Sequence, residues 1–256
     1  MTAAKLSHLV PVYDGKGITL YCARFEQILP HLHDESIDAL LTDPPYAITS
    51  LKWDKAVEWP AFWTDAVRIC KARAPMVFFA SGKFVPQLIH SNSKMYRYDL
   101  IWEKNLAVGH LDANRRPLRS HESILVFSKQ FRGATYNPQK VRGRPHTIGK
   151  GNRPAHYGSS SGNVEERTTN LYHPKSVLKF NNTRIGRSLH PTQKPVDLMK
   201  WLVLTYTNRG DLILEPFAGS GSTLVAAAFH GRKAIGIEQD PAYCEVIIER
   251  LEKGLD

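Results

Sequence analysis

The sequence predicts an α/β protein in which a mostly parallel β-sheet is covered by helices on both faces. Short, continuously apolar runs alternate along the chain with longer segments whose apolar residues recur at helical spacing. Strands that are apolar throughout, rather than at every second residue, are typical of a parallel sheet buried on both sides. The 256 residues, 42% of them hydrophobic and 23% charged, suit one globular domain or one domain with a large insertion.

The first half of the chain supplies most of the expected strands. A buried strand over 37–42 must end at Pro44 and Pro45, because proline cannot donate to a sheet ladder. Pro60 suits the first turn of a helix whose apolar residues would face the sheet. The pattern predicts strands over 37–42, 75–80, 98–102 and 122–128, and helices over 60–71 and 84–91.

Regular patterns stop at about residue 132 and resume at Pro195. Between 132 and 169 Gly alternates with Arg, Lys, Asn, Ser and Pro, and no apolar period survives. A long structureless stretch is unusual in a compact domain, so we expect this one to be both functional and mobile. Beyond it the pattern predicts helices over 195–207, 222–230 and 243–253, and strands over 212–214 and 234–237.

Positive charge gathers in one segment of the chain. The net charge is +10, and residues 101–190 alone hold 16 Lys and Arg against 5 Asp and Glu. The remainder of the chain is therefore close to neutral. A basic segment in an otherwise neutral protein is the charge pattern expected of a protein that binds a phosphate backbone. The alternative is a basic loop that is merely solvated.

Cysteine usage and hydropathy exclude several classes of protein. Cys22, Cys70 and Cys244 are widely separated and odd in number, so we expect reduced packing thiols rather than disulfides or a zinc cluster. No apolar run is long enough to span a membrane, and polar residues interrupt the start of the chain where a secretory signal would lie. A soluble cytoplasmic protein is expected.

A glycine-rich turn follows the expected strand over 212–214. Phe217-Ala218-Gly219-Ser220-Gly221-Ser222-Thr223 would join that strand to a helix, so that free backbone N–H groups face a polar ligand. The third glycine of the dinucleotide fingerprint is absent. Glu238 lies 19 residues after Gly219, about where Rossmann-like folds place the acid that binds ribose hydroxyls. The pattern favours a nucleoside cofactor over a purely structural turn.

A stiff polar motif follows the expected strand over 37–42. Pro44 and Pro45 fix their own φ angles and keep Asp43 out of the helical region, so Asp43 and Tyr46 project beyond the strand. The lone pair of an aromatic amine is delocalised into its ring. Acceptors on the N–H bonds, here the Asp43 carboxylate and the Pro44 carbonyl, favour the pyramidal amine that can attack an electrophile. Tyr46 is suited to stack on a base rotated out of a duplex, although a turn that merely caps a strand is the structural alternative.

Together these motifs resemble those of the DNA amino-methyltransferases of the permuted beta class, which use S-adenosylmethionine (SAM). Asp43-Pro44-Pro45-Tyr46 is similar to the catalytic motif of this class, and residues 217–223 are similar to its SAM loop. The segment His190-Pro191-Thr192-Gln193-Lys194-Pro195 resembles the one that lines the methionine end of SAM. Residues 103–104 and 121–127 resemble the central strands. The catalytic motif precedes the SAM loop, as in the permuted class.

The resemblance implies a Rossmann-like methyltransferase fold with a seven-stranded, mostly parallel sheet in circularly permuted motif order. It implies a single domain over 1–256, with a basic, partly flexible target-recognition insertion over about 130–189. It implies SAM as the cofactor without a metal, double-stranded DNA as the partner, and a homodimer among the states allowed. The catalytic residues would be Asp43, Pro44, Pro45 and Tyr46. The cofactor would be bound by Asp43, Thr192, Lys194, Phe217, Ala218, Gly219, Ser220, Gly221, Ser222, Thr223, Glu238 and Gln239. The DNA would be bound by Arg115, Arg116, Arg119, Arg132, Lys140, Arg142, Arg144, Lys150 and Arg153.

One position departs from the pattern of the class. Its members usually carry Gly-Asp shortly after the first strand, near the adenosine end of SAM, and this chain has Ala23 and Arg24 at the matching positions. Cofactor contacts at that end are therefore expected to differ, while the catalytic motif is intact.

Several related activities compete with adenine methylation. Asp43 favours adenine, because cytosine amino-methyltransferases more often begin the motif with Ser, and RNA or protein-glutamine enzymes usually begin it with Asn. Ring-carbon methylation of cytosine needs a Cys after a Pro, and no Cys of this chain follows one. A catalytically silent DNA-binding protein of the same fold is the alternative from another class, although a broken motif, its expected sign, is not seen.

Overall fold

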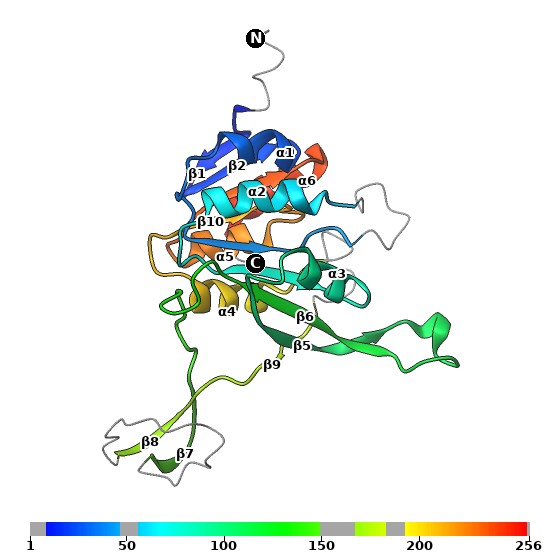
Figure 1. Cartoon of the computed structure of the whole chain (residues 1–256), viewed down its shortest axis with the longest axis vertical. Helices are drawn as coiled ribbons and strands as arrows, with labels where there is room; N and C mark the ends of the chain where they lie inside the picture. The colour runs from blue at the N-terminus through cyan, green and yellow to red at the C-terminus, as the bar shows by residue number, and fades with distance from the viewer. Residues whose placement is uncertain (1–8, 47–55, 149–166, 183–192, 255–256) are drawn as a thin grey trace. The chain divides into compact units, whose positions relative to one another are not determined.

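The computed structural model describes residues 9–46, 56–148, 167–182 and 193–254 of the chain. By its contacts the chain divides into two units, one formed by Met1–Asn137 with Ser176–Asp256 and the other by Pro138–Lys175. The first unit holds a nine-stranded sheet with its helices, and the second holds a two-stranded sheet (Figure 1).

The large sheet has the strand order β1-β2-β11-β10-β3-β4-β6-β5-β9. Its strands are Tyr13–Gly15 (β1), Ile18–Cys22 (β2), Ala39–Thr42 (β3), Met76–Ala80 (β4), Tyr96–Val108 (β5), Arg119–Phe127 (β6), Val177–Lys179 (β9), Leu212–Glu215 (β10) and Lys233–Glu238 (β11). Neighbours from β2 to β4 in this order pair in parallel, whereas β6 is antiparallel to both β4 and β5. These seven strands confirm the expected seven-stranded, mostly parallel sheet, and β1 and β9 extend its two edges.

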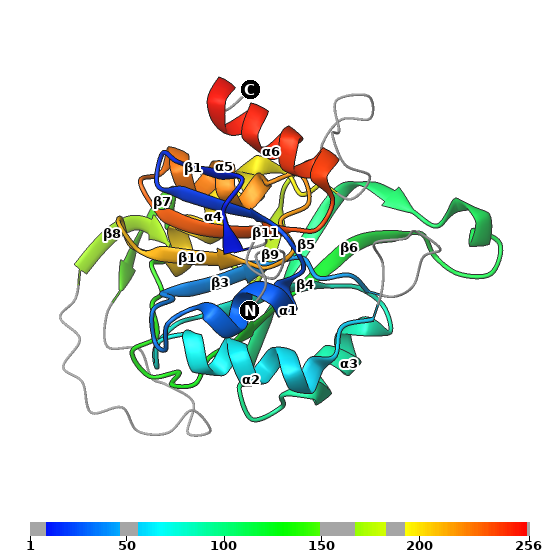
Figure 2. The same cartoon turned by 90° about the horizontal axis from the view of Figure 1, so that it is seen from above.

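Helices cover both faces of this sheet, as the continuous apolar runs predicted (Figure 2). One face carries α1 (Phe25–Ile28), α2 (Trp59–Ile69) and α3 (Phe84–Ser91), and the other carries α4 (Val196–Tyr206), α5 (Ser222–Phe229) and α6 (Pro241–Lys253). Alternate residues of β3 enter the two cores, with Leu40 on the first face and Leu41 on the second. Within the described residues, no helix is long and apolar enough to cross a membrane.

The element boundaries were predicted best where strands are fully buried. Every residue of β3 and β4 is buried, and both strands lie within the predicted runs. By contrast, β5 and β6 extend well beyond 98–102 and 122–128, because their outer halves are exposed and have no continuous apolar pattern. The short elements β1, α1 and β9 were not expected, since three or four residues carry too little periodicity to be read.

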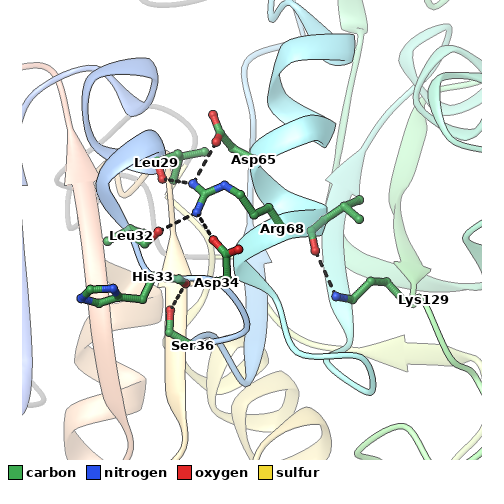
Figure 3. Close-up of polar contacts among 9 residues, drawn as sticks. Leu29, Leu32, His33, Asp34, Ser36, Asp65, Arg68 and Lys129 are labelled. Atoms are coloured by element: carbon green, nitrogen blue, oxygen red, sulfur yellow. Dashed lines mark hydrogen bonds and ion pairs between the residues drawn. The ribbon is translucent and has the colours of Figure 1, made fainter.

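A guanidinium group fixes α2 at the amino edge of the sheet, the edge at which β3 begins. Arg68 on α2 donates to the carbonyl oxygens of Leu29 and Leu32, at 2.9 and 2.8 Å, in the segment that leads into β3 (Figure 3). It also donates to Asp34 Oδ1 at 2.6 Å and to Asp65 Oδ1 at 3.0 Å. This network lies at the edge opposite to the one where Asp43 follows β3.

The second unit contains a β-pair that the sequence pattern did not predict. Strands β7 (Val141–Ile148) and β8 (Arg167–Tyr172) pair antiparallel, so the expectation of a structureless segment was wrong for 141–148 and 167–169. The pairing depends on Tyr172, whose hydroxyl donates to the Arg144 carbonyl at 3.0 Å and whose ring lies 4.3 Å from that of His146. The same ring covers Gly143, where a Cβ would lie 2.6 Å from it. Cross-strand contacts of this kind leave no apolar period in the sequence, and residues 149–166 lie outside the described part.

Candidate active site

The two sequence motifs lie side by side at the carboxyl edge of the sheet. Strands β3 and β10 are parallel neighbours, with Leu40 paired to Leu214. Asp43 follows β3, and the glycine loop that contains Gly219 follows β10. Because parallel strands end at the same edge, the catalytic motif and the loop face the same space, which is where α/β sheets bind their ligands.

The buried carboxylate of Glu215 joins the ends of these two strands. Glu215 Oε1 accepts from the Thr42 hydroxyl at 2.5 Å and from the Phe217 N–H at 3.2 Å, and Oε2 accepts from the Thr223 hydroxyl at 2.7 Å. The residue is 3% exposed, and burial raises the pKa of its carboxyl to about 8. One side chain thus holds β3, the loop and the start of α5 together.

The glycine loop presents bare backbone where a ligand can approach. Gly219 has φ +52°, and a Cβ built on it would meet no atom of the described residues within 4 Å. Gly221 has φ +78°, and a Cβ there would lie 2.8 Å from Ile247 Cγ1, so α6 packs directly against the turn. Arg250 of α6 donates to the Ser220 carbonyl from behind. The loop is therefore fixed on one side and open at Gly219.

Glu238, at the end of β11, reaches the same loop. Its Oε2 accepts from the Gly219 N–H at 2.7 Å, and its Oε1 accepts from the Asp240 N–H at 2.9 Å. Burial raises the pKa of this carboxyl above its ordinary value, while the backbone N–H groups of Asp240, Gly219 and Gln239 oppose the shift. A carboxylate can accept about four hydrogen bonds, so Glu238 keeps capacity for a hydroxyl donor. The neighbouring Gln239 is exposed.

Asp43 is held by two side chains and still faces solvent. Its Oδ1 accepts from the Tyr46 hydroxyl at 2.8 Å, and its Oδ2 accepts from the Lys194 ammonium. Burial raises the pKa of the Asp43 carboxyl, while Lys194 and Tyr46 favour its ionised form. The side chain remains 23% exposed, against 9% for Lys194, so the carboxylate opens outward and the ammonium lies behind it. The Tyr46 ring stacks on Phe84 with centroids 4.8 Å apart.

Two more charged side chains, Glu122 and Lys104, lie on the side of Lys194 away from Asp43. Its Nζ lies 3.5 Å from Glu122 Oε2 on β6, and Glu122 Oε1 accepts from the Lys104 ammonium on β5. Burial lowers the pKa of Lys194, but Asp43 and Glu122 outweigh it and raise that pKa above its ordinary value. Burial raises the pKa of Glu122, but Lys194 and Lys104 outweigh it and hold that pKa below its ordinary value. Asp43, Lys194, Glu122 and Lys104 thus form a row of alternating charges, which we call the charge row.

Sequence reasoning gave no role to Lys104, Glu122 or Glu215. Glu215 ends an apolar strand, and Lys104 and Glu122 lie next to the apolar parts of β5 and β6; that position is the one signal the sequence offers. Their partners are distant in sequence, such as Thr42 for Glu215, and are set by strand order. The signal marks them as unusual without saying what they contact.

The predicted DNA-binding residues lie in different places. Arg115 and Arg116 lie at the end of the β5–β6 hairpin, where both contact Asp112 and Arg115 is 86% exposed. Arg119, the first residue of β6, pairs with Val108 at the loop end of the two strands and donates to Ser81 Oγ at 2.7 Å. Arg132 is exposed after β6, and Lys140, Arg142 and Arg144 are exposed in the second unit. Lys150, Arg153 and the predicted cofactor ligand Thr192 lie outside the described residues.

Comparison with known proteins decides the family. The sequence model described as DNA methylase, which covers N6- and N4-methyltransferases, matches residues 37–249. The chain belongs to this family. The match spans both motifs, so the resemblance to amino-methyltransferases is confirmed.

This DNA methylase is similar to several bacterial type II methyltransferases and to one bacterial DNA adenine methyltransferase. It is 46% identical to the type II methyltransferase M2.LlaDCHI of Lactococcus lactis subsp. cremoris, over 95% of this chain and 93% of that protein. It is 28% identical to M.HpaI of Haemophilus parainfluenzae, over 91% and 74% of the two chains. It is 27% identical to the DNA adenine methyltransferase YhdJ of Escherichia coli (strain K12), over 85% and 77%.

Solved structures agree with the fold. The complex of M1.HpyAVI with SAM has a TM-score of 0.61 at 26% identity, covering 91% of this chain and all of that one. The cytosine-N4-specific PvuII DNA methyltransferase has a TM-score of 0.65 at 17% identity, covering 96% of both chains, and supports the fold alone. The DNA methylase is thus a SAM-dependent enzyme with a methyltransferase fold that acts on double-stranded DNA.

The described residues fit SAM at the carboxyl edge. The open backbone at Gly219 leaves room for a ligand, and Glu238 beside it keeps acceptor capacity for a hydroxyl donor. When bound, SAM supplies an electrophilic methyl group on a sulfonium. Within the described residues no cluster of His, Cys, Asp and Glu could hold a metal ion.

Proposed function

We propose that this DNA methylase transfers the methyl group of SAM to the exocyclic amine of adenine in duplex DNA, with the target base flipped out of the helix. The observation that carries the proposal is the Asp43 carboxylate, which is partly exposed at the carboxyl edge and whose strand adjoins the one that leads into the glycine loop. An enzyme that acts on an atom inside a duplex must rotate the base out to reach it.

In this proposal Asp43, Pro44, Pro45 and Tyr46 act on the amine. The Asp43 carboxylate and the Pro44 carbonyl accept its N–H bonds and so free the nitrogen lone pair for attack. The Tyr46 ring packs on Phe84, which holds the ring beside Asp43. The transfer is a direct displacement by a neutral amine, so positioning and electrostatics supply the catalysis.

Adenine rather than cytosine is favoured by the residue that begins the catalytic motif. Asp43 suits adenine, and one relative is named as an adenine methyltransferase. The test is to incubate the protein with plasmid DNA and tritiated SAM, digest the DNA to nucleosides and identify the labelled product. Label in N6-methyladenine supports the proposal, whereas label in N4-methylcytosine would show that cytosine is the target instead. Absence of label would indicate a catalytically silent DNA-binding protein.

The proposed SAM site combines the glycine loop with the side chains around it. Residues from Phe217 to Thr223 would surround the cofactor, with Glu238 on the ribose and Gln239 next to it. Lys194 and Thr192 would lie toward the methionine end, with Asp43 between cofactor and base. Ala23 and Arg24, which replace the usual Gly-Asp, lie at the end of β2 beside β11, where the Ala23 N–H donates to the Glu238 carbonyl at 2.9 Å.

Replacing Glu238 with Ala should weaken SAM binding by about tenfold or more, because a charged hydrogen bond to the ribose is worth about 1.5–3 kcal/mol. Calorimetric titration with SAM measures the effect. Glu245→Ala is the matched control, since Glu245 is an exposed carboxylate on the neighbouring helix α6. Unchanged affinity in Glu238→Ala would mean that the ribose is held elsewhere.

Basic side chains in both units are proposed to contact the DNA backbone. Arg142 and Arg144 are exposed on β7, and Arg115 and Arg116 extend from the β5–β6 hairpin. That hairpin leaves the carboxyl edge of the sheet, because β6 is antiparallel to β4 and begins beyond the end of β4. Arginines at such places position a duplex without reading its sequence.

Replacing Arg142 and Arg144 together with Ala should flatten the salt dependence of DNA binding by about one to two units of slope, because fewer counterions are released. SAM affinity should not change. The strand should persist, because Tyr172 contacts the Arg144 backbone rather than its side chain. DNA titrations at several salt concentrations measure the slope, with Lys233→Ala at the amino edge as the control. A slope equal to that of the parent would exclude phosphate contacts by these two arginines. The Arg115→Ala, Arg116→Ala variant would then test whether the hairpin makes those contacts.

A further inference from the structure

The charge row connects the root of the β5–β6 hairpin to the proposed catalytic carboxylate. Three of its side chains are nearly buried, with exposed fractions of 10% for Lys104, 14% for Glu122 and 9% for Lys194. The fourth, Asp43, ends the row and is 23% exposed. The Lys194 ammonium lies 4.8 Å from the centre of the Phe79 ring, and the Lys104 ammonium lies 4.7 Å from that of Trp102. Aromatic faces therefore flank both cations, and Lys194 has a carboxylate on either side.

The oxygens of the two carboxylates are not equally occupied. Both oxygens of Asp43 accept from protein donors, Tyr46 and Lys194. Glu122 Oε1 accepts from Lys104, whereas Glu122 Oε2 is inaccessible to solvent and has no closely bonded donor among the described residues. The nearest cation to that oxygen is the Lys194 ammonium at 3.5 Å. A buried carboxylate oxygen whose nearest donor lies as far as 3.5 Å is uncommon enough to need an explanation.

The proposed function, on which this inference rests, requires Asp43 to accept an N–H of the target amine. In the structure the Lys194 ammonium occupies Asp43 Oδ2. We propose that Glu122 is a positioning residue for methyl transfer, whose Oε2 takes over the Lys194 ammonium when the target amine binds to Asp43. The distance of 3.5 Å needs to shorten to an ordinary hydrogen bond of about 2.9 Å, a movement of less than ~1 Å.

The exchange keeps every charge paired while the acceptor becomes available. Lys194 stays between two carboxylates throughout, so no buried ion is left without a counter-ion, which would be costly. Lys104 holds the other oxygen of Glu122 and fixes the carboxylate in place. The row thus lets an oxygen of Asp43 bind a neutral amine without expelling an ammonium into solvent.

Replacing Glu122 with Gln tests the role, because an amide has the shape of the carboxylate but only one acceptor oxygen, which Lys104 already uses. The single-turnover rate constant should fall by roughly ten- to a hundredfold. The affinities for SAM and for DNA should stay within about twofold of the parent, since the residue acts on the transfer step. Glu103→Gln is the matched control, because Glu103 is a more exposed carboxylate of the same hairpin and pairs with Lys179 on the surface.

The pH dependence of the rate separates positioning from a structural effect. Asp43 is faced by Lys194, Tyr46, Glu122 and Glu215, Lys194 by Asp43 and Glu122, and Glu122 by both lysines. The Glu122 charge raises the pKa of Asp43, so in Glu122→Gln the acidic limb of the rate profile should move to lower pH. A general loss of structure would lower the profile without moving it.

A double-mutant cycle identifies the partner. In a Lys194→Met background, Glu122→Gln should cause no further loss of rate, because its effect passes through the ammonium. Should Glu122→Gln fail to fold, Glu122→Asp retains the charge beside Lys104 but withdraws the oxygen from Lys194, and it should lose rate in the same way. The inference would be overturned if the Glu122 variant that folds kept the parental rate. It would also be overturned if the losses of rate in that variant and in Lys194→Met were additive in the double variant. If Asp43→Ala itself kept its rate, the proposed function would fail instead.

Discussion

Replacing Asp43 with Ala should lower the rate constant of methyl transfer by a hundredfold or more, roughly the cost of removing one positioned hydrogen-bonding group from an active site. Asp43 is the acceptor at the exposed end of the charge row, and its strand adjoins the one that leads into the glycine loop. The loss should appear in single-turnover assays with saturating SAM and DNA, because the interaction forms with the reacting amine rather than on binding.

The fold should survive this substitution. Lys194 keeps Glu122 as a counter-ion, and the side chain of Asp43 bonds no backbone group of the sheet. The melting temperature should therefore stay within about 4 °C of the parent. Asp34→Ala is the control, because Asp34 is an exposed carboxylate at the opposite edge of the sheet (Figure 3). A near-parental transfer rate in Asp43→Ala would remove the proposed catalytic role.

The parts of the fold that were predicted from the sequence are those with a local cause. The helix over 84–91 was predicted to the residue, and the strands around Leu40 and Val77 were evident because both of their faces are buried. The β7–β8 pair was not predictable in this way, since Tyr172 covering Gly143 is a contact between residues far apart in the sequence. The hairpin of β5 and β6 was underestimated for the same reason, because strand pairing continues there without apolar residues.

The candidate site shows the same division. Asp43 and the glycine loop were evident because proline and glycine restrict their own backbone in recognisable ways. Glu122 was noted only as part of a strand, although pairing of β5 with β6 places it opposite Trp102, within reach of Lys104. Lys194 was assigned to the cofactor from resemblance, and its pairing with Asp43 in the structure was not foreseen. Charge pairs between strands depend on strand order, which local patterns do not contain.

Replacing Glu215 with Ala should cost about 3 kcal/mol or more in the free energy of unfolding, through lost hydrogen bonds and a buried cavity. The substitution leaves the Thr42 and Thr223 hydroxyls and the Phe217 N–H without their acceptor at a position that is 3% exposed. Urea unfolding at neutral pH measures the loss, and SAM binding should weaken as well, since the loop loses its anchor to β3. A loss below 1 kcal/mol would mean that the three donors find other partners.

Replacing Glu215 with Gln should instead change how stability depends on pH. Burial raises the pKa of this carboxyl in the folded protein to about 8, from an ordinary value near 4.5. Between these values the folded state retains a proton that the unfolded state has lost. The stabilising contribution of Glu215 is therefore complete below pH 4.5 and declines as the pH rises to about 8, by up to about 1.4 kcal/mol per pH unit.

The amide of Glu215→Gln does not titrate. The free energy of unfolding of this variant should therefore increase relative to that of the parent as the pH rises from 5 to 8. Urea unfolding of both proteins across that range measures the difference. Parallel pH profiles would show that Glu215 is already ionised in the fold, with its three donors outweighing the cost of burial.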